Sequence, residues 1–281
     1  MRPPDTSKLS RRLCLDTPLV AGEALAALLH HSQGQKAAEP DWISQYREEL
    51  QPEAKILGDI AVLEICGVLA KKPDIYEMAY CGVEDMDGIT RMVKQVIDAS
   101  TVKGILLKID SPGGFVNGTP ELGDLVAKLS ALKPTVAFTD CMMCSAAYWI
   151  ASQAGYIVAS KSSIVGSIGV YSSLVDFSKY YESMGLKVEV FTNNEGTLKA
   201  AGLTGTSLTN EQRDNFQARC QRDFDAFKAA VLVKRTIPDE AMKGQTFNGL
   251  EAKGFGLVDM VGDEDEAMFA LRQLINRAQL G

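Results

Sequence analysis

Short apolar runs alternate with helical spacings along the chain from about residue 58 onward. Apolar runs bounded by turn residues predict strands at 60–65, 104–109, 135–139 and 156–159. Apolar positions at helical spacing predict helices at 86–99 and 119–132, and a further apolar helix follows Ser145. This alternation predicts an α/β fold of stacked βαβ units with parallel pairing, whose sites lie beyond the carboxyl ends of the strands.

Turn-forming and polar residues become more frequent after residue 160. Residues 166–170 are rich in turn signals, and a helix at 176–184 and a strand at 187–191 are predicted next. Thr209 and Gln212 have the spacing of a capping box at the start of a long helix. The apolar face of that helix carries Phe216, Cys220, Phe224, Phe227 and Val231. The tail is predicted to form a turn, a strand and a closing helix.

The composition is that of an ordinary globular chain. Of its 281 residues, 46% are hydrophobic and 23% are charged, which is enough apolar material for a sizeable core. The pattern predicts one domain over residues 56–281, preceded by an extension over residues 1–55 that is partly helical or flexible. The net charge of −7 argues against a nucleic-acid partner, because no basic stripe is present to neutralise phosphates.

The sequence also bears on compartment and membrane. Six cysteines without regular spacing indicate a reducing compartment. The basic pair at residues 11–12 is followed by Asp16 and Glu23, so no signal peptide is predicted. The 20 residues between Asp140 and Lys161 carry no charge, which is nominally enough to span a bilayer. Because they include serine, glutamine and glycine, we interpret them as a buried helix, a turn and a strand, and we expect a cytoplasmic protein.

Ser145 is the candidate nucleophile, because a step of small residues would leave its hydroxyl exposed where an apolar helix begins. A serine needs a base within hydrogen-bond reach. The two histidines, His30 and His31, lie in a polar N-terminal stretch, which points to an amine as the base, as in Ser-Lys dyads. Lys199 lies in a loop of small residues and is the candidate, provided that burial lowers its pKa and Glu195 points away. A solvated surface lysine remains the alternative.

Acyl transfer also needs donors for the developing oxyanion. Gly113 and Gly114 follow Pro112 in a predicted turn, where the backbone can approach a ligand without a Cβ in the way. The amide of Ala146, at the start of a helix, is the natural second donor and gains from the helix dipole. A tight turn without catalytic purpose remains the alternative for this Ser-Pro-Gly-Gly segment.

Cys141 and Cys144 have the spacing of a redox or zinc motif. No second pair accompanies them and no histidine lies nearby, so neither a metal nor another cofactor is expected. We interpret them as packing cysteines, with Cys144 as a nucleophilic thiol as the lesser alternative.

Taken together, these motifs resemble the signal peptide peptidase A group of serine peptidases, family S49, which shares the ClpP/crotonase fold. Four segments match in order, namely residues 110–114, 144–148 and 166–170, and the Lys199 loop with its following helix. The resemblance implies that Ser145 is the nucleophile, Lys199 the general base and Ser167 a hydrogen-bond partner of the lysine. It also implies an oxyanion hole formed by Gly113 or Gly114 with Ala146. The usual final glycine of the nucleophile motif is replaced here by Ala147.

The resemblance further implies a polypeptide substrate and a ring-like homo-oligomer in which adjacent subunits can share active sites. Cys-Ser-Ala at the nucleophile and the N-terminal extension look like phage head-maturation proteases, which cleave scaffold and portal proteins inside the prohead. We therefore expect capsid maturation in the host cytoplasm or prohead. The alternatives are a signal peptide peptidase A-like enzyme that degrades signal or other peptides, a crotonase-like acyl-CoA enzyme, and an inactive ring-forming assembly protein.

Overall fold

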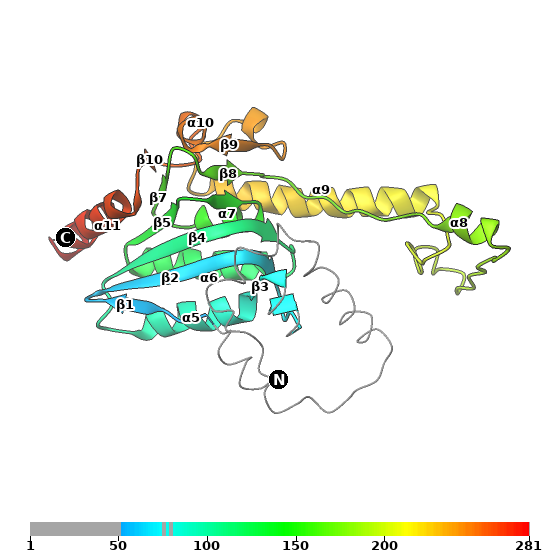
Figure 1. Cartoon of the computed structure of the whole chain (residues 1–281), viewed down its shortest axis with the longest axis horizontal. Helices are drawn as coiled ribbons and strands as arrows, with labels where there is room; N and C mark the ends of the chain where they lie inside the picture. The colour runs from blue at the N-terminus through cyan, green and yellow to red at the C-terminus, as the bar shows by residue number, and fades with distance from the viewer. Residues whose placement is uncertain (1–51, 75–76, 79–80, 281) are drawn as a thin grey trace, which may run out of the picture. The chain divides into compact units, whose positions relative to one another are not determined.

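The computed structural model describes residues 52–74, 77–78 and 81–280 (Figure 1). The chain divides into two compact units. The first unit runs to Ile168 and resumes at Ala230, and the second unit is Gly169–Ala229. Apart from its last four residues, the extension predicted over residues 1–55 lies outside the described residues.

The first unit is built on a largely parallel sheet. Its strands are β1 (Lys55–Leu57), β2 (Ile60–Ala70), β3 (Val83–Asp85), β4 (Gly104–Gly114), β5 (Thr135–Thr139), β6 (Met142–Cys144), β7 (Tyr156–Ala159), β8 (Ile164–Gly166), β9 (Thr246–Asn248) and β10 (Met260–Val261). The order is β10-β7-β5-β4-β6-β8-β9, with β2 paired along β4. Among the described strands, only the β1–β2 and β8–β9 pairs are antiparallel. The predicted parallel α/β class is therefore confirmed.

Helices join and cover these strands. Those of the first unit are α5 (Met86–Asp98), α6 (Thr119–Leu132), α7 (Ala146–Ala151), the short 3₁₀ helix η1 (Asp239–Ala241), α10 (Gly249–Gly254) and α11 (Glu264–Leu280). The second unit contains α8 (Ser178–Ser183) and most of α9 (Asn210–Leu232), whose last turn belongs to the first unit. Among the described helices, none is long and apolar enough to cross a bilayer.

Alternating side chains of the central strands build the core. Ile60, Leu106 and Val136 pack with Leu271 and Ile275 of α11 in one buried cluster. A Cβ at Gly104 would lie 2.4 Å from the Ile275 Cδ1 atom, so only glycine lets α11 approach this closely. The predicted closing helix therefore packs directly on the strands of the core.

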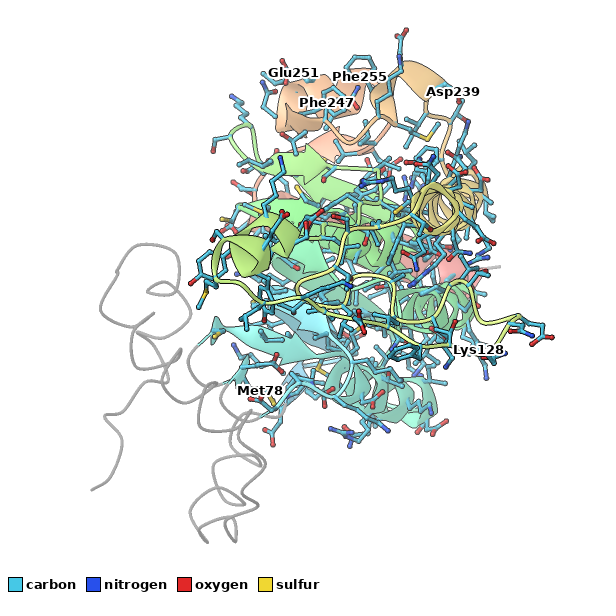
Figure 2. All side chains as sticks on the ribbon, turned by 90° about the vertical axis from the view of Figure 1, so that its right-hand side faces the viewer. Met78, Lys128, Asp239, Phe247, Glu251 and Phe255 are labelled. Carbon is cyan, nitrogen blue, oxygen red and sulfur yellow. The ribbon has the colours of Figure 1, made fainter. Side chains whose placement is uncertain are left out.

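The tail of the first unit is held by local contacts. The Phe247 and Phe255 rings are in contact, with their centroids 4.7 Å apart and their planes tilted by 47°, beside the short helix α10 (Figure 2). Asn248 and Glu251 form a capping box at the start of α10. The predicted strand and closing helix are present as β10 and α11, whereas α10 was not predicted, because its six residues are too few for a helical period to show.

The second unit differs more from the sequence prediction. The strand predicted at 187–191 is wrong, because this segment has no neighbour to pair with and Phe191 is 90% exposed. The capping box at α9 is confirmed, since the Thr209 amide donates to Gln212 Oε1 at 3.1 Å and the Gln212 amide donates to Thr209 Oγ1 at 3.2 Å. The helix predicted at 176–184 is confirmed in its central part as α8.

Two predicted elements of the first unit have different lengths. The strand predicted to end at residue 109 continues through the Ser-Pro-Gly-Gly segment to Gly114, because β2 pairs with it up to Asp110 and again at Gly113 and Gly114, and β6 pairs with it at Ser111. The turn predicted there is therefore wrong. The uncharged stretch between Asp140 and Lys161 forms β6, α7 and β7, as its serine and glycine content indicated.

Candidate active site

Ser145 lies between β6 and α7, at the carboxyl end of a parallel strand. Its backbone has φ 52° and ψ −125°, which a residue other than glycine rarely adopts. The Ser145 amide donates to the Gly166 carbonyl at 2.8 Å, and the Ser145 carbonyl accepts from the Trp149 amide at 2.9 Å. These bonds hold a sharp strand-to-helix turn, the kind of turn that presents the nucleophilic serine in α/β-hydrolases.

Gly113 packs directly against this serine. Its φ is 102°, and a Cβ at this position would lie 2.5 Å from Ser145 Cβ and 2.9 Å from the Ala146 nitrogen. Only glycine fits between them, so the close backbone approach expected from the sequence is present, although it is made by a strand end.

The two glycines of the pair are placed differently. Gly113 is buried and its amide donates to Ser111 Oγ at 3.1 Å, whereas Gly114 is exposed. Gly114 is in register with Leu69 of β2, and the Phe115 amide donates to the Leu69 carbonyl at 2.9 Å. Because successive peptide groups of a strand point to opposite sides, the Gly114 N–H is directed away from β2.

The start of α7 completes the surroundings of Ser145. The first N–H groups of a helix have no intrahelical acceptor, so the Ala146 amide is directed out of the helix beside Ser145. Ala147 is fully buried and, unlike Ser145, has no positive φ. The methyl group that replaces the usual glycine is therefore accommodated by packing.

Ser167 lies beside this group at the end of β8. Its φ is 52°, its amide donates to the Gln245 carbonyl at 2.8 Å, and the preceding Gly166 accepts the Ser145 amide. The structure thus brings Ser145, Ala146, Gly113 and Ser167 together where β4, β6 and β8 end. The sequence predicted Gly113 and Ser145 beyond strand ends, whereas Ser167 was expected only from the family resemblance.

Lys199 belongs to the second unit. It lies in a turn, where its amide donates to the Gly196 carbonyl at 2.9 Å, and it is exposed within the single chain. The loop is tied to the start of α9, because Gln212 Nε2 donates to the Thr197 carbonyl at 3.2 Å. The Glu195 carboxylate accepts from Asn193 Nδ2 at 3.1 Å, and its pKa is lowered by its own backbone amide and by this side chain.

Cys144 is not built as a nucleophile. It is buried, its Sγ lies 3.4 Å from the Ile164 carbonyl, and burial raises the pKa of its thiol to about 11. A thiol with that pKa is protonated at neutral pH, and protonated thiols are poor nucleophiles. The interpretation of Cys144 as a packing residue therefore fits the structure better than the thiol alternative.

Lys234 lies near α7, and no motif in the sequence marks it as functional. Burial lowers its pKa, and its Nζ donates to the Gln153 carbonyl at 2.6 Å and to Ser130 Oγ at 3.1 Å. These contacts place it at the C-terminal end of α7. Ser145 lies at the other end, about 9 Å away along a helix of six residues, so Lys234 is not its base.

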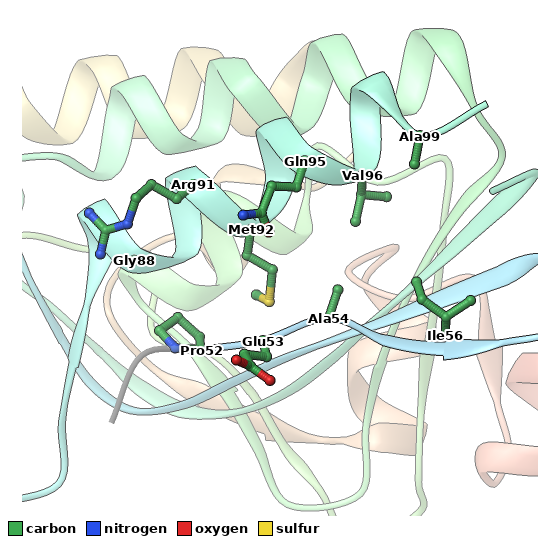
Figure 3. A pocket seen from close by; sticks show the side chains of 10 residues that line it. All are labelled: Pro52, Glu53, Ala54, Ile56, Gly88, Arg91, Met92, Gln95, Val96 and Ala99. Atoms are coloured by element: carbon green, nitrogen blue, oxygen red, sulfur yellow. The ribbon is translucent and has the colours of Figure 1, made fainter. Parts of the chain in front are cut away.

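A cavity of about 420 Å³ lies elsewhere on the first unit, between residues 52–56 and α5 (Figure 3). Its lining includes Glu53, Arg91, Met92 and Gln95, and none of the candidate catalytic residues. It is therefore separate from the group around Ser145.

The family of the chain follows from comparison with known proteins. Residues 127–277 match the model of peptidase family S49. A "Putative protease MJ0651" of Methanocaldococcus jannaschii is 35% identical over 63% of this chain and 57% of its own length. "Protease 4" of Haemophilus influenzae is 27% identical over 85% of this chain and 38% of its own. "Capsid assembly protease C" of Escherichia phage lambda is 26% identical over 79% of this chain and 51% of its own.

The chain belongs to peptidase family S49. The family resemblance predicted from the sequence is confirmed, and the structure contains the stacked βαβ units with parallel pairing that the sequence predicted. The chain spans between 38% and 57% of the lengths of these three relatives. We therefore consider serine peptidase chemistry for the residues around Ser145.

Proposed function

We propose that the chain is a serine endopeptidase with a Ser-Lys dyad, in which Ser145 is the nucleophile and Lys199 the general base. The observation that carries this proposal is the strained turn at Ser145, with Gly113 packed against it and the Ala146 amide beside it. Strain of this kind persists only where the surrounding structure enforces it, and it is concentrated at functional sites. The family resemblance gives Ser167, which directly follows β8, the role of orienting the lysine.

The proposed reaction has two stages. The neutral Lys199 amine takes the Ser145 Oγ proton while Oγ bonds to the substrate carbonyl carbon, and the carbonyl electron pair moves onto oxygen. The oxyanion accepts hydrogen bonds from the Ala146 amide and one glycine amide. Its collapse breaks the C–N bond, and the departing amine takes the proton from the lysine. Water then attacks the ester with the same amine as base, which releases the acid and restores the Ser145 hydroxyl.

Lys199 must lose its exposure for this chemistry, because a solvated ammonium does not deprotonate serine at neutral pH. We infer that assembly supplies the burial. All residues of the second unit are described, and Phe227 alone among its hydrophobic side chains is buried. Tyr171, Val175 and Phe191 are 89%, 73% and 90% exposed. Exposed apolar surface on this scale is typical of an interface, which supports a ring-like homo-oligomer.

For the biological role we propose capsid maturation in a phage or prophage, by cleavage of scaffold or portal polypeptides in the host cytoplasm or prohead. The capsid assembly protease of phage lambda matches over 79% of this chain, which supports this role. The second candidate is a peptidase that degrades signal or other peptides, favoured by the match to Protease 4 over 85% of the chain. Cleavage of a co-expressed scaffold polypeptide, with signal peptides left intact, would favour the first candidate.

The proposed chemistry is tested with a fluorophosphonate probe on the purified full chain. We expect a single adduct on Ser145, located by peptide mass spectrometry, and no adduct in Ser145→Ala or Lys199→Arg, although both variants fold. Labelling of the wild type should also slow as the pH falls, because protonation removes the base. An adduct on another residue would refute the site, and a rate independent of pH near neutrality would refute the amine base.

The same samples distinguish the rival classes. A crotonase-like enzyme would bind coenzyme A in a titration and would need a carboxylate near Gly113 and Gly114, and an inactive assembly protein would assemble but never react with the probe. Ser145→Ala should assemble like the wild type and lose proteolysis.

A further inference from the structure

Ser111 is a buried serine to which the proposed reaction gives no role. It is fully buried on β4, two residues before Gly113. Its hydroxyl donates to the Gly67 carbonyl at 2.6 Å and accepts the Gly113 amide at 3.1 Å. One side chain therefore connects β2 to the glycine that packs against Ser145.

The connection depends on an irregularity in β2. The register of β2 on β4 shifts between Cys66 and Val68, and Gly67 at this bulge has φ 82°. The Val68 amide donates to the Gly82 carbonyl at 3.2 Å, on the side of β3 and not of β4, and a Cβ at Gly67 would lie 2.0 Å from the Gly82 carbonyl oxygen. The bulge is thus fixed from both sides, and it directs the Gly67 carbonyl to the Ser111 hydroxyl.

Gly113 is in turn enclosed between Ser111 and the Ser145 turn. Its amide is taken by Ser111 Oγ, and its Cα lies against Ser145 and Ala146 with no room for a side chain. The next amide, that of Gly114, is directed away from β2, which is the side on which β4 pairs with β6 ahead of Ser145. The Gly114 residue is exposed, as a group that meets substrate must be.

We propose that Ser111 is a positioning residue that holds the Gly113 amide out of the reaction and sets the Gly114 amide as the oxyanion donor. This inference rests on the proposed function, since it names which of the two glycines acts. Without the Ser111 hydroxyl, the Gly113 amide and the Gly67 carbonyl lose their bonds in a buried place. The peptide between Gly113 and Gly114 is then free to rotate, and the Gly114 N–H no longer points at the position of the oxyanion.

The test compares Ser111→Ala with Ser163→Ala. Ser163 is also fully buried, and its hydroxyl donates to the Ser160 carbonyl at 2.7 Å, so it controls for the loss of a buried hydroxyl bond. The rate of fluorophosphonate labelling of Ser145 is measured against probe concentration, which separates the maximal rate from the apparent affinity. A thermal melt of each variant shows that it is folded at the assay temperature.

We expect Ser111→Ala to lower the maximal labelling rate by about 10- to 100-fold, below or near the ~100-fold loss typical of removing an oxyanion donor outright. Its apparent affinity and the pH dependence of labelling should stay unchanged, because neither the nucleophile nor the base is altered. Ser163→Ala should label at the wild-type rate. If Ser111→Ala does not fold, Ser111→Cys takes its place, because a thiol keeps the γ position but bonds more weakly.

Labelling of the wild type distinguishes failure of the proposed function from failure of the proposed role of Ser111. A wild-type chain that is not labelled on Ser145 overturns the proposed function itself. A wild type that is labelled on Ser145, together with a folded Ser111 variant that reacts at the same maximal rate, overturns the role of Ser111 alone. An equal loss in Ser163→Ala also overturns it, because the effect would then follow from any lost buried hydroxyl.

Discussion

Ser145 combines a reactive position with an unfavourable backbone. A non-glycine residue at φ 52° and ψ −125° costs about 1–3 kcal/mol, and the bonds to Gly166 and Trp149 sustain it. The cost belongs to the backbone and not to the hydroxyl, so removing the hydroxyl alone does not relieve it.

This separation predicts different stabilities for two inactive variants. Ser145→Gly should be more stable than Ser145→Ala by about 1 kcal/mol in urea unfolding, because glycine adopts positive φ without a steric penalty. Neither variant should react with the fluorophosphonate probe. Equal midpoints and slopes for the two variants would show that the turn is not strained.

The protonation state of the Cys144 thiol gives a second prediction for a single residue. With a pKa of about 11, roughly one in a thousand of its thiols is ionised at pH 8, so iodoacetamide should alkylate it far more slowly than in the unfolded chain. Mass spectrometry of the Cys141–Trp149 region, with and without urea, measures this. Because the folded state favours the neutral thiol, this contribution to stability is present below pH 9 and is lost as the pH rises toward 11. Rapid alkylation of the folded chain at pH 8 would reopen the thiol alternative.

The single residues of the site differ in how far the sequence could predict them. Ser145 and Gly113 could be found because local signals mark them, namely a small-residue step before an apolar helix and a glycine pair at a strand end. Ser111 could not, because its partner Gly67 lies 44 residues away at a bulge that no local pattern announces. Lys199 stays a prediction, since its role depends on surroundings that its own loop does not provide.

At the scale of elements, the C-terminal end of α7 is held by charged side chains that follow α9. Lys234 donates to the Gln153 carbonyl, and Arg235 donates to the Ala154 carbonyl at 3.0 Å. Arg235 also pairs with Asp259 at 2.5 Å, and its side chain is only 5% exposed. The helix that begins at Ser145 is thus fixed at its far end, where cations also complement the helix dipole.

Breaking the Arg235 contacts should be costly. Arg235→Ala leaves the Ala154 carbonyl and the partly exposed Asp259 carboxylate without this partner, and we expect a loss of about 1.5–3 kcal/mol in the free energy of unfolding. Lys55 pairs with Glu64 at 2.7 Å at a site where the lysine is 66% exposed, so Lys55→Ala should cost only about 0–1 kcal/mol. Chemical denaturation of both variants measures the difference. A loss under 1 kcal/mol in Arg235→Ala would mean that the Arg235 contacts are not needed to hold α7.

Helices and strands could be predicted where local sequence signals determine their bounds. α6 and β5 have the predicted bounds, and the capping box at Thr209 marks the start of α9. The predicted strand at 187–191 failed because β-propensity acts only when a neighbouring strand accepts the hydrogen bonds. The predicted strand at 104–109 was too short because pairing with β2 overrides the turn preference of proline and glycine.

At the scale of the whole molecule, the second unit lacks a buried apolar core of its own. Among its residues, all of which are described, Phe227 is the only buried hydrophobic side chain, and the others are exposed or half-buried. Its local bonds, such as those of Asp176 with Ser178 and Ser207, fasten loops without building a core. Burial of apolar surface is the main source of stability in a fold. A unit of this kind therefore gains most of its stability by packing on other protein surface, which a second copy of the chain can provide.

If subunits share active sites, two inactive chains should restore each other. A Lys199→Ala chain retains Ser145, and a Ser145→Ala chain retains Lys199, so a mixed oligomer contains complete pairs of the two side chains. We expect the probe to label Ser145 of the Lys199→Ala chain only when both chains are co-expressed and purified together through different tags. In a random mixture, about a quarter of the wild-type label should return, because half of the chains carry Ser145 and half of their neighbours carry Lys199. Co-expression of the Lys199→Ala chain with a Ser145→Ala, Lys199→Ala double variant is the matched control, and it should give no label. Label that never returns in a verified mixed oligomer, while the wild type reacts, would mean that each chain supplies both residues of its own site.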